Sequence, residues 1–186
     1  MRILGISGSL RHESHNSRLL RAAAEMLPSG AELVPVKGLA LVPPYNEDLD
    51  TAGAPRAVQL LREQVAEADA VVVATPEYNA SVPGHLKNAI DWVSRPFDDN
   101  PFRGKPVLVI GASTGIFGAV WAQAELRKVL NHLGAKVADS ELAVGQAHLA
   151  LSDEGWRESE LASRLAEQLG ELVLRASGVE RESAAA

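Results

Sequence analysis

Cysteine is absent from this chain of 186 residues, and aromatic residues are few. Without cysteine the chain forms no disulfide, holds no thiolate-bound metal and has no cysteine nucleophile. It contains only three Trp, two Tyr and three Phe, so we expect a core built mainly from aliphatic side chains. Six of these rings nevertheless gather in one part of the chain, as Tyr78, Trp92, Phe97, Phe102, Phe117 and Trp121.

Excess positive charge and long apolar runs are also missing. Lys and Arg number 18 against 24 Asp and Glu, and the net charge of −6 disfavours nucleic acid as a partner. No run approaches the ~18 uninterrupted apolar residues of a membrane helix, and the apolar start at residues 1–7 is too short for a signal peptide. We therefore expect a cytoplasmic protein without membrane association. The length predicts a single domain over residues 1–178, with residues 179–186 as a disordered tail.

Short apolar runs rich in Val and Ile alternate along the chain with stretches of helical periodicity. Runs without polar alternation are typical of strands buried on both faces of a sheet. They lie at residues 3–7, 33–36, 70–74 and 107–111, and residues 137–144, of mixed polarity, are expected as an edge strand. Apolar stripes predict five helices, within residues 19–27, 58–68, 82–93, 126–133 and 161–173.

This alternation predicts an α/β fold, a three-layer doubly wound domain around a five-stranded parallel sheet. Ligands of such sheets bind beyond the carboxyl ends of the strands, near the point where the strand order reverses. The loops after the first, third and fourth strands are therefore the places to look for a functional site.

The loop after the first strand lacks the glycine pattern of a Rossmann dinucleotide site, and the second strand ends at Lys37 rather than at an acid. It instead places hydroxyl, amide and arginine side chains before a helix whose N–H groups and dipole favour an anion. The alternative is that Ser14 or Asn16 only caps the helix. One cap needs one such residue, so five donors favour a bound phosphate monoester: Ser9, Arg11, Ser14, Asn16 and Ser17.

The other two loops suit a planar ligand. Prolines stiffen residues 75–84, where Ser81 can cap the next helix, and one ring with two polar side chains suits the face and edge of a heterocycle. Residues 111–119 contain three glycines and two hydroxyls, which let the backbone approach a ligand closely. Each loop alone could be an ordinary connection, but three such loops at one end of a sheet favour a binding site.

These motifs resemble those of the NADPH-dependent FMN reductase family of flavodoxin-like proteins, which includes quinone and chromate reductases. The resemblance rests on residues 8–16, 75–79, 83–92 and 111–118, and covers residues 1 to about 175. It implies that Arg11, Ser14 and Asn16, with Ser9 nearby, bind the FMN phosphate. It further implies flavin contacts from Pro76, Glu77, Tyr78 and Asn79 along the isoalloxazine ring, and from Ser113, Thr114 and Gly115.

The resemblance also implies the strand order 2-1-3-4-5 and a homodimer or homotetramer. The expected activity is an FMN-dependent NAD(P)H oxidoreductase, with NADPH or NADH as donor and a quinone, free flavin, azo compound or metal oxyanion as small-molecule acceptor. No catalytic side chain is required, because the flavin carries the reactivity. Three alternatives stay open: a flavodoxin-type one-electron carrier, a flavin-supplying partner of a monooxygenase, and a flavin-free binding module.

The clustered rings and the five histidines complete the expectations. Tyr78 is expected near the flavin, and Trp92, Phe97 or Phe102 at a surface that faces a partner subunit. The alternative is that Phe97 and Phe102 pack against their own sheet. No metal site is expected, because the chain lacks cysteine and has no carboxylate cluster at ligand spacing.

Overall fold

The computed structural model describes residues 1–51, 53–151 and 154–178, so the tail predicted at residues 179–186 lies outside the described part. Its strands are β1 (Arg2–Ser7), β2 (Glu32–Pro35), β3 (Ala70–Thr75), β4 (Pro106–Ala112), β5 (Lys136–Val137) and β6 (Leu142–Val144). Its helices are α1 (His15–Glu25), α2 (Arg56–Glu67), α3 (Gly84–Val93), α4 (Val120–His132), α5 (Ala147–Ala150) and α6 (Glu160–Ala176). Short 3-10 helices occupy η1 (Leu39–Leu41), η2 (Glu47–Leu49), η3 (Phe97–Asp99) and η4 (Glu154–Glu158).

All strands are parallel, in the order β2-β1-β3-β4-β5, with β6 also paired to β4. The predicted doubly wound sheet with the order 2-1-3-4-5 is confirmed. The fifth position differs in detail, because two short strands replace the single strand expected at residues 137–144. β5 pairs with the start of β4 and β6 with its end, and the polar residues 139–141 between them lie outside both strands.

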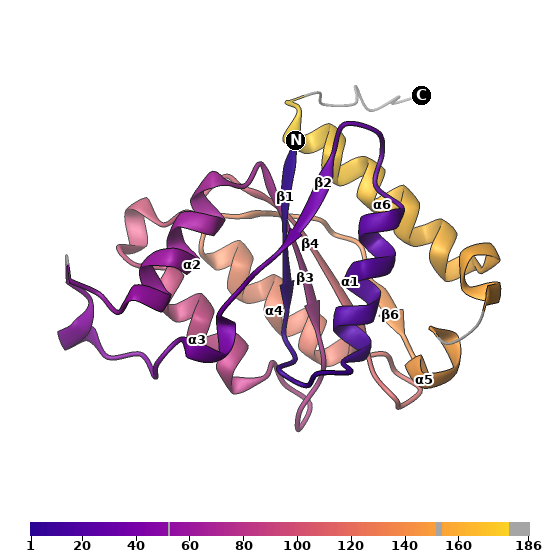
Figure 1. Ribbon diagram of the computed structural model, residues 1–186, viewed down its shortest axis with the longest axis horizontal. Helices are drawn as coiled ribbons and strands as arrows, with labels where there is room; N and C mark the ends of the chain where they lie inside the picture. The colour runs from indigo at the N-terminus through magenta and orange to yellow at the C-terminus, as the bar shows by residue number, and fades with distance from the viewer. Residues whose placement is uncertain (52, 152–153, 179–186) are drawn as a thin grey trace.

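Helices cover both faces of the sheet (Figure 1). α2, α3 and α4 pack on one face around a cluster that includes Leu61, Leu86 and Leu126. α1 and α6 pack on the other face around Leu19 and Leu165. Every residue of β3 and β4 is buried, as their unbroken apolar runs predict. None of the helices in the described residues has the length and apolar character needed to cross a bilayer.

Two of the clustered rings belong to the interior, which corrects the expectation of a partner-facing surface for them. Trp92 and Phe102 are only 0% and 1% exposed. The Trp92 indole donates a hydrogen bond to the Pro43 carbonyl at 2.8 Å and meets the Tyr45 ring edge-on, with centroids 4.9 Å apart. The segment that covers Trp92 is distant in the sequence, so residues 92–102 alone suggested an exposed ring. Phe97 does lie at the surface.

Candidate functional site

The loops after β1, β3 and β4 meet at one edge of the sheet, at the bottom of Figure 1. Hydrogen bonds tie them together: the Gly8 N–H donates to the Ala74 carbonyl at 2.8 Å, and the Asn16 side chain bonds to both backbone groups of Ala112. The parallel sheet places the ends of these strands side by side. The structure therefore brings together the three segments that the sequence selected.

Two of the predicted phosphate ligands have structural roles in the β1–α1 loop. Ser14 is the N-cap of α1, and its hydroxyl oxygen accepts hydrogen bonds from the N–H groups of Asn16 and Ser17. Asn16 is 2% exposed and directs its carboxamide to Ala112 rather than to solvent. Ser14 therefore does cap the helix. Capping uses the Ser14 oxygen as an acceptor, so its hydroxyl hydrogen is still available to a ligand.

The remaining groups of this loop fit a phosphate. Within the described residues, the backbone N–H groups of residues 12–14 have no hydrogen-bond partner, and the guanidinium of Arg11 has no ionic partner. α1 has no acidic side chain in its first turn. Unpaired N–H groups at the start of an 11-residue helix, next to an unpaired cation, are the groups that an anion site needs.

The pKa of His15 reflects the positive charge of this region. Burial, then the nearby Arg11, Arg18 and His148, hold the pKa of His15 below its usual value of 6.5. Its Nδ1 is buried without a hydrogen-bond partner. A phosphate at the start of α1 would offset that charge, so the electrostatics of the loop agree with its hydrogen-bond geometry.

The β3–α3 loop forms a two-residue hairpin that projects from the sheet edge. Tyr78 and Ser81 exchange backbone hydrogen bonds of 3.1 and 3.2 Å. Between them, Asn79 and Ala80 have φ angles of 54° and 59°, the left-handed pair of a type I′ turn. Pro76 is buried at the base, whereas Tyr78 is 49% exposed. The hairpin therefore presents Tyr78 and the turn at the open end of the sheet.

Two carboxylates fasten this hairpin to α4. Glu77 accepts hydrogen bonds from the N–H groups of Trp121 and Ala122 at 3.0 and 3.1 Å. It thereby caps α4, because the alanine at the N-cap position, Ala119, has no side-chain acceptor. Glu125 accepts from the Ser81 hydroxyl at 2.6 Å and from the Val82 N–H at 3.2 Å. These two hydrogen bonds lower the pKa of Glu125 below its usual value of 4.5.

The expectation that Ser81 caps the next helix is wrong. α3 begins at Gly84 after Pro83, without a side-chain cap. The Ser81 hydroxyl instead bonds to Glu125, which the sequence reading did not include in the site. No local pattern links residues 81 and 125, so only the tertiary structure could reveal this contact.

The β4–α4 loop is hydrogen-bonded to the turn between β6 and α5. The Gln146 N–H donates to the Gly115 carbonyl at 2.9 Å, and Ser113 bonds through its N–H to Val144 and through its carbonyl to Ala147. Gly118 has φ 59° and lies so close to the Ala143 backbone that a Cβ there would clash. Thr114 and Gly115 remain exposed at the site.

Gln123 is a supporting residue that sequence reasoning missed. It is fully buried, and its Nε2 donates to the Gly118 carbonyl at 3.1 Å beneath the same loop. Gly111 allows this approach, because a Cβ there would come within 2.7 Å of that nitrogen. A polar residue three positions before Leu126, on the apolar face of α4, is the signal that could have identified it.

Comparison with known proteins agrees with this geometry. The model of the NADPH-dependent FMN reductase family matches residues 1–149. The chain belongs to this family. An NAD(P)H-dependent FMN reductase of Pseudomonas aeruginosa is 44% identical over 171 residues, 90% of each chain. A quinone reductase of Escherichia coli is 40% identical over 146 residues, which cover 78% of this chain and 77% of that protein.

Among solved structures, the flavoenzyme NAD(P)H:acceptor oxidoreductase FerB of Paracoccus denitrificans superposes with a TM-score of 0.83. It is 34% identical, and the match covers 95% of this chain and 97% of that chain. Membership of the FMN reductase family confirms the predicted class of enzyme, an FMN-dependent NAD(P)H oxidoreductase that reduces small molecules. In the described residues, no three His, Asp or Glu side chains gather closely enough to hold a metal ion.

Proposed function

We propose that this FMN reductase passes electrons from NADPH or NADH through bound FMN to a quinone or a similar flat oxidant. The observation that carries the proposal is that three loops meet at one sheet edge. The first has unpaired N–H groups at the start of α1, the second is the hairpin with an exposed ring, and the third is the tightly packed loop after β4. The first loop suits a phosphate, and the other two suit the face and the polar edge of a planar ring.

In this arrangement the N–H groups of residues 12–14, Ser14 and Arg11 hold the FMN phosphate. Ser9 and Ser17 are nearby hydroxyls, although the Ser17 Oγ already lies 2.9 Å from the Ser7 Oγ. Asn16 acts indirectly, because its side chain holds the loop to β4. The isoalloxazine ring lies between Pro76–Asn79 and Ser113–Gly115.

Bound FMN supplies hydride and electron transfer, and the protein positions and tunes it. The N–H groups of Asn79 and Ala80 have no hydrogen-bond partner in the described residues. Fixed N–H groups at the hairpin tip stabilise negative charge that develops on a reduced ring. Glu77 and Glu125 keep those groups in place through α4.

Exposed rings beside the hairpin support a planar acceptor. Phe117 and Trp121 are 56% and 50% exposed and meet edge-on with centroids 5.0 Å apart. Tyr78 on the hairpin is exposed as well, and Glu77 of the same hairpin bonds to the Trp121 N–H, so exposed rings lie on both segments beside the proposed flavin position. Such a surface suits the face of a quinone better than a compact hydrophilic oxidant.

We also propose that the protein is a cytoplasmic homodimer or homotetramer in which a neighbouring subunit helps to enclose the site. The exposed rings of Phe97, Phe117 and Trp121 support this, since aromatic residues are enriched at interfaces. Sedimentation at micromolar concentration should give a dimer or tetramer, and a monomer would contradict the proposal. Fractionation of the source cells should recover the protein with the cytoplasmic enzymes.

The activity is tested on the purified protein. It should bind FMN and turn yellow, and it should oxidise NADPH or NADH when menadione is supplied. Yellow protein that oxidises neither nucleotide would indicate a one-electron carrier, and protein that ignores FMN would indicate a flavin-free module. Release of reduced flavin to solution in preference to menadione reduction would indicate a flavin supplier. If Tyr78→Ala and Asn79→Ala both left FMN affinity and turnover unchanged, the ring placement would be wrong.

A further inference from the structure

A groove of about 520 Å³ lies beside the phosphate loop, between α1 and the chain that follows β2. Gly5 and Ser7 of β1 line it at the sheet, and Leu20 and Arg21 line it from α1. Residues 35, 36 and 38–40 line it from the opposite side. It shares Ser9 and Ser17 with the phosphate loop, so a ligand in the groove lies next to the proposed flavin phosphate. None of the flavin contacts proposed above requires the rest of this groove.

The groove exists because the sheet ends at β2. β2 pairs only with β1 among the described strands, and its residues are exposed or half-buried. Leu20, Leu33 and Val36 therefore leave apolar surface beside the edge. Gly5 keeps the sheet side of the groove flat, because a Cβ at that position would clash with the Leu33 side chain.

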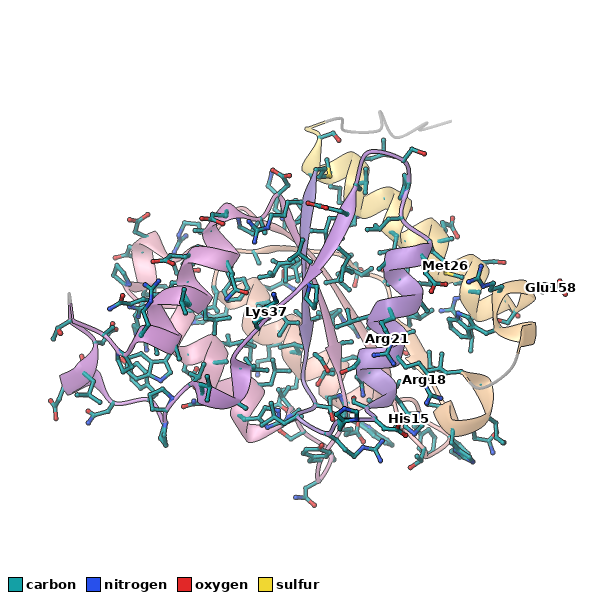
Figure 2. The ribbon with its side chains drawn as sticks, viewed as in Figure 1. His15, Arg18, Arg21, Met26, Lys37 and Glu158 are labelled. Carbon is teal, nitrogen blue, oxygen red and sulfur yellow. The ribbon has the colours of Figure 1, made fainter. Side chains whose placement is uncertain are left out.

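One unpaired cation, Arg21, lines this apolar surface, and two others lie near it in the chain. Arg21 lines the groove, and Arg18 lies one turn earlier on α1; neither side chain has an ionic or hydrogen-bond partner in the described residues. Figure 2 shows both on the face of α1 toward the viewer, with Lys37 across from them on the segment after β2. The Lys37 side chain likewise has no partner among the described residues. The acidic residue that ends α1, Glu25, is already paired with Arg157 at 2.6 Å.

These features suit a ligand with a flat ring and an anionic group, close to the proposed flavin position. The electron donor of this enzyme class provides one, because NADPH carries an adenine ring and a ribose 2′-phosphate at the end remote from its nicotinamide. Arg21 lines the groove, and Lys37 lies in the sequence between the lining residues Val36 and Gly38, which makes these two cations the candidates to bind the 2′-phosphate.

We propose that the groove between α1 and β2 binds the adenosine 2′-phosphate end of NADPH. The adenine contacts the apolar wall formed by Leu20, Leu33 and Val36, and the 2′-phosphate is bound by Arg21 and Lys37. Ser9 and Ser17 lie at the end nearest the flavin. NADH lacks the 2′-phosphate and loses the contacts to both cations, so the groove makes the enzyme prefer NADPH. The inference rests on the proposed reductase activity for its choice of ligand.

Fragment binding tests the site without turnover. Adenosine 2′,5′-diphosphate should bind to the FMN-loaded protein, as measured by calorimetry, and more tightly than adenosine 5′-monophosphate. Arg21→Gln should weaken the diphosphate by roughly tenfold or more, the loss expected for a charge-assisted hydrogen bond, and should change the monophosphate little. Lys37→Gln should act in the same direction. Arg175→Gln is the matched control, because Arg175 is exposed near the end of α6 and has no partner in the described residues.

A second variant tests the space in the groove independently of its charges. Ala24 lines the groove on an exposed position of α1, so Ala24→Phe should weaken both fragments by filling the space. Ala66→Phe, on an exposed position of α2, should change neither. Equal binding by wild type, Arg21→Gln and Ala24→Phe would overturn the proposal, and so would an equal loss in Arg175→Gln.

Kinetics supply the last comparison. In Arg21→Gln, kcat/KM for NADPH relative to NADH should fall roughly tenfold, through KM rather than kcat. An unchanged ratio would contradict the assignment. FMN titration and NADH oxidation by wild type identify the source of any failure. If both proceed but the fragments bind elsewhere or not at all, only the groove assignment is wrong; if FMN does not bind, the proposed activity itself fails.

Discussion

The side chain of Asn16 makes two hydrogen bonds to the backbone of Ala112: Nδ2 donates to its carbonyl at 2.9 Å, and Oδ1 accepts its N–H at 3.0 Å. β3 pairs with β4 only as far as Gly111, so Ala112, the last residue of β4, has no strand partner on that side. Asn16 takes the place of the missing strand and ties the start of α1 to the loop after β4.

Replacing this carboxamide should destabilise the protein. Asn16→Ala leaves a buried N–H and a buried carbonyl unpaired, and we expect the free energy of unfolding to fall by roughly 2–4 kcal/mol. Denaturant titration measures it. Asn16→Asp should also destabilise, because a carboxylate cannot donate to the Ala112 carbonyl. Asn131→Ala, at an exposed position of α4, should change little, and an equally small effect of Asn16→Ala would contradict this role.

The charge of Arg11 should matter only for a ligand with a phosphate. Arg11→Gln should raise the dissociation constant of FMN roughly tenfold, because one charged hydrogen-bond donor is lost. Fluorescence quenching of the flavin provides the measurement. Riboflavin, which has no phosphate, should bind both forms alike. An equal loss for riboflavin would show that Arg11 acts on the ring or on the folding of the loop.

The carboxylate of Glu125 should make stability depend on pH. Its folded-state pKa lies below the usual value of 4.5, mainly because of the Ser81 hydrogen bond and then that of Val82. Its contribution is therefore complete above pH 4.5 and is lost as the pH falls through the lowered pKa. Unfolding of wild type and Glu125→Gln should differ at pH 7 and converge in acid. A constant difference across this range would show that the carboxylate charge is not the cause.

The left-handed turn at the hairpin tip strains the backbone of Ala80, and a substitution there can relieve that strain. Ala80 has φ 59°, where an alanine side chain is disfavoured and glycine is not. Ala80→Gly should stabilise the protein by roughly 0.5 kcal/mol after the entropy cost of glycine. Asn79→Gly is the comparison, because asparagine tolerates this region and should gain nothing. Thermal unfolding measures the stability of both variants. Destabilisation by Ala80→Gly would show that the backbone at Ala80 is not strained.

Local pattern was enough to predict most of the framework. Unbroken Val and Ile runs predicted the buried β3 and β4, and apolar stripes predicted the helices that cover them. The boundaries were less accurate where no periodicity marks them: α4 begins at Val120, a turn and a half before its predicted apolar stripe, and the fifth strand is split. The polar residues 139–141 signalled an irregular edge but not two separate strands.

The roles of the polar residues at the site depend on which hydrogen-bond partner the fold places beside each of them. Asn16 and Ser14 were recognised as important, but the side chain of Asn16 faces Ala112 and that of Ser14 caps α1. Glu125 and Gln123 were not recognised from the sequence, and the partner of Glu125, Ser81, lies 44 residues away. Gln123 bonds to Gly118, five residues before it, in the loop that leads into α4. A carboxylate or carboxamide can satisfy many partners, and the sequence does not specify which one the fold supplies.

The sequence by itself determined the doubly wound sheet, the three loops at its carboxyl edge and their likeness to FMN reductases, because periodicity and loop composition are local properties. Only the tertiary structure decided that Trp92 and Phe102 are core residues, and that a groove lined by Arg21 lies beside the phosphate loop. Burial and shape depend on which segments pack together. The covering of Trp92 by residues 43–45, and the open edge at β2, arise from contacts between segments far apart in the chain.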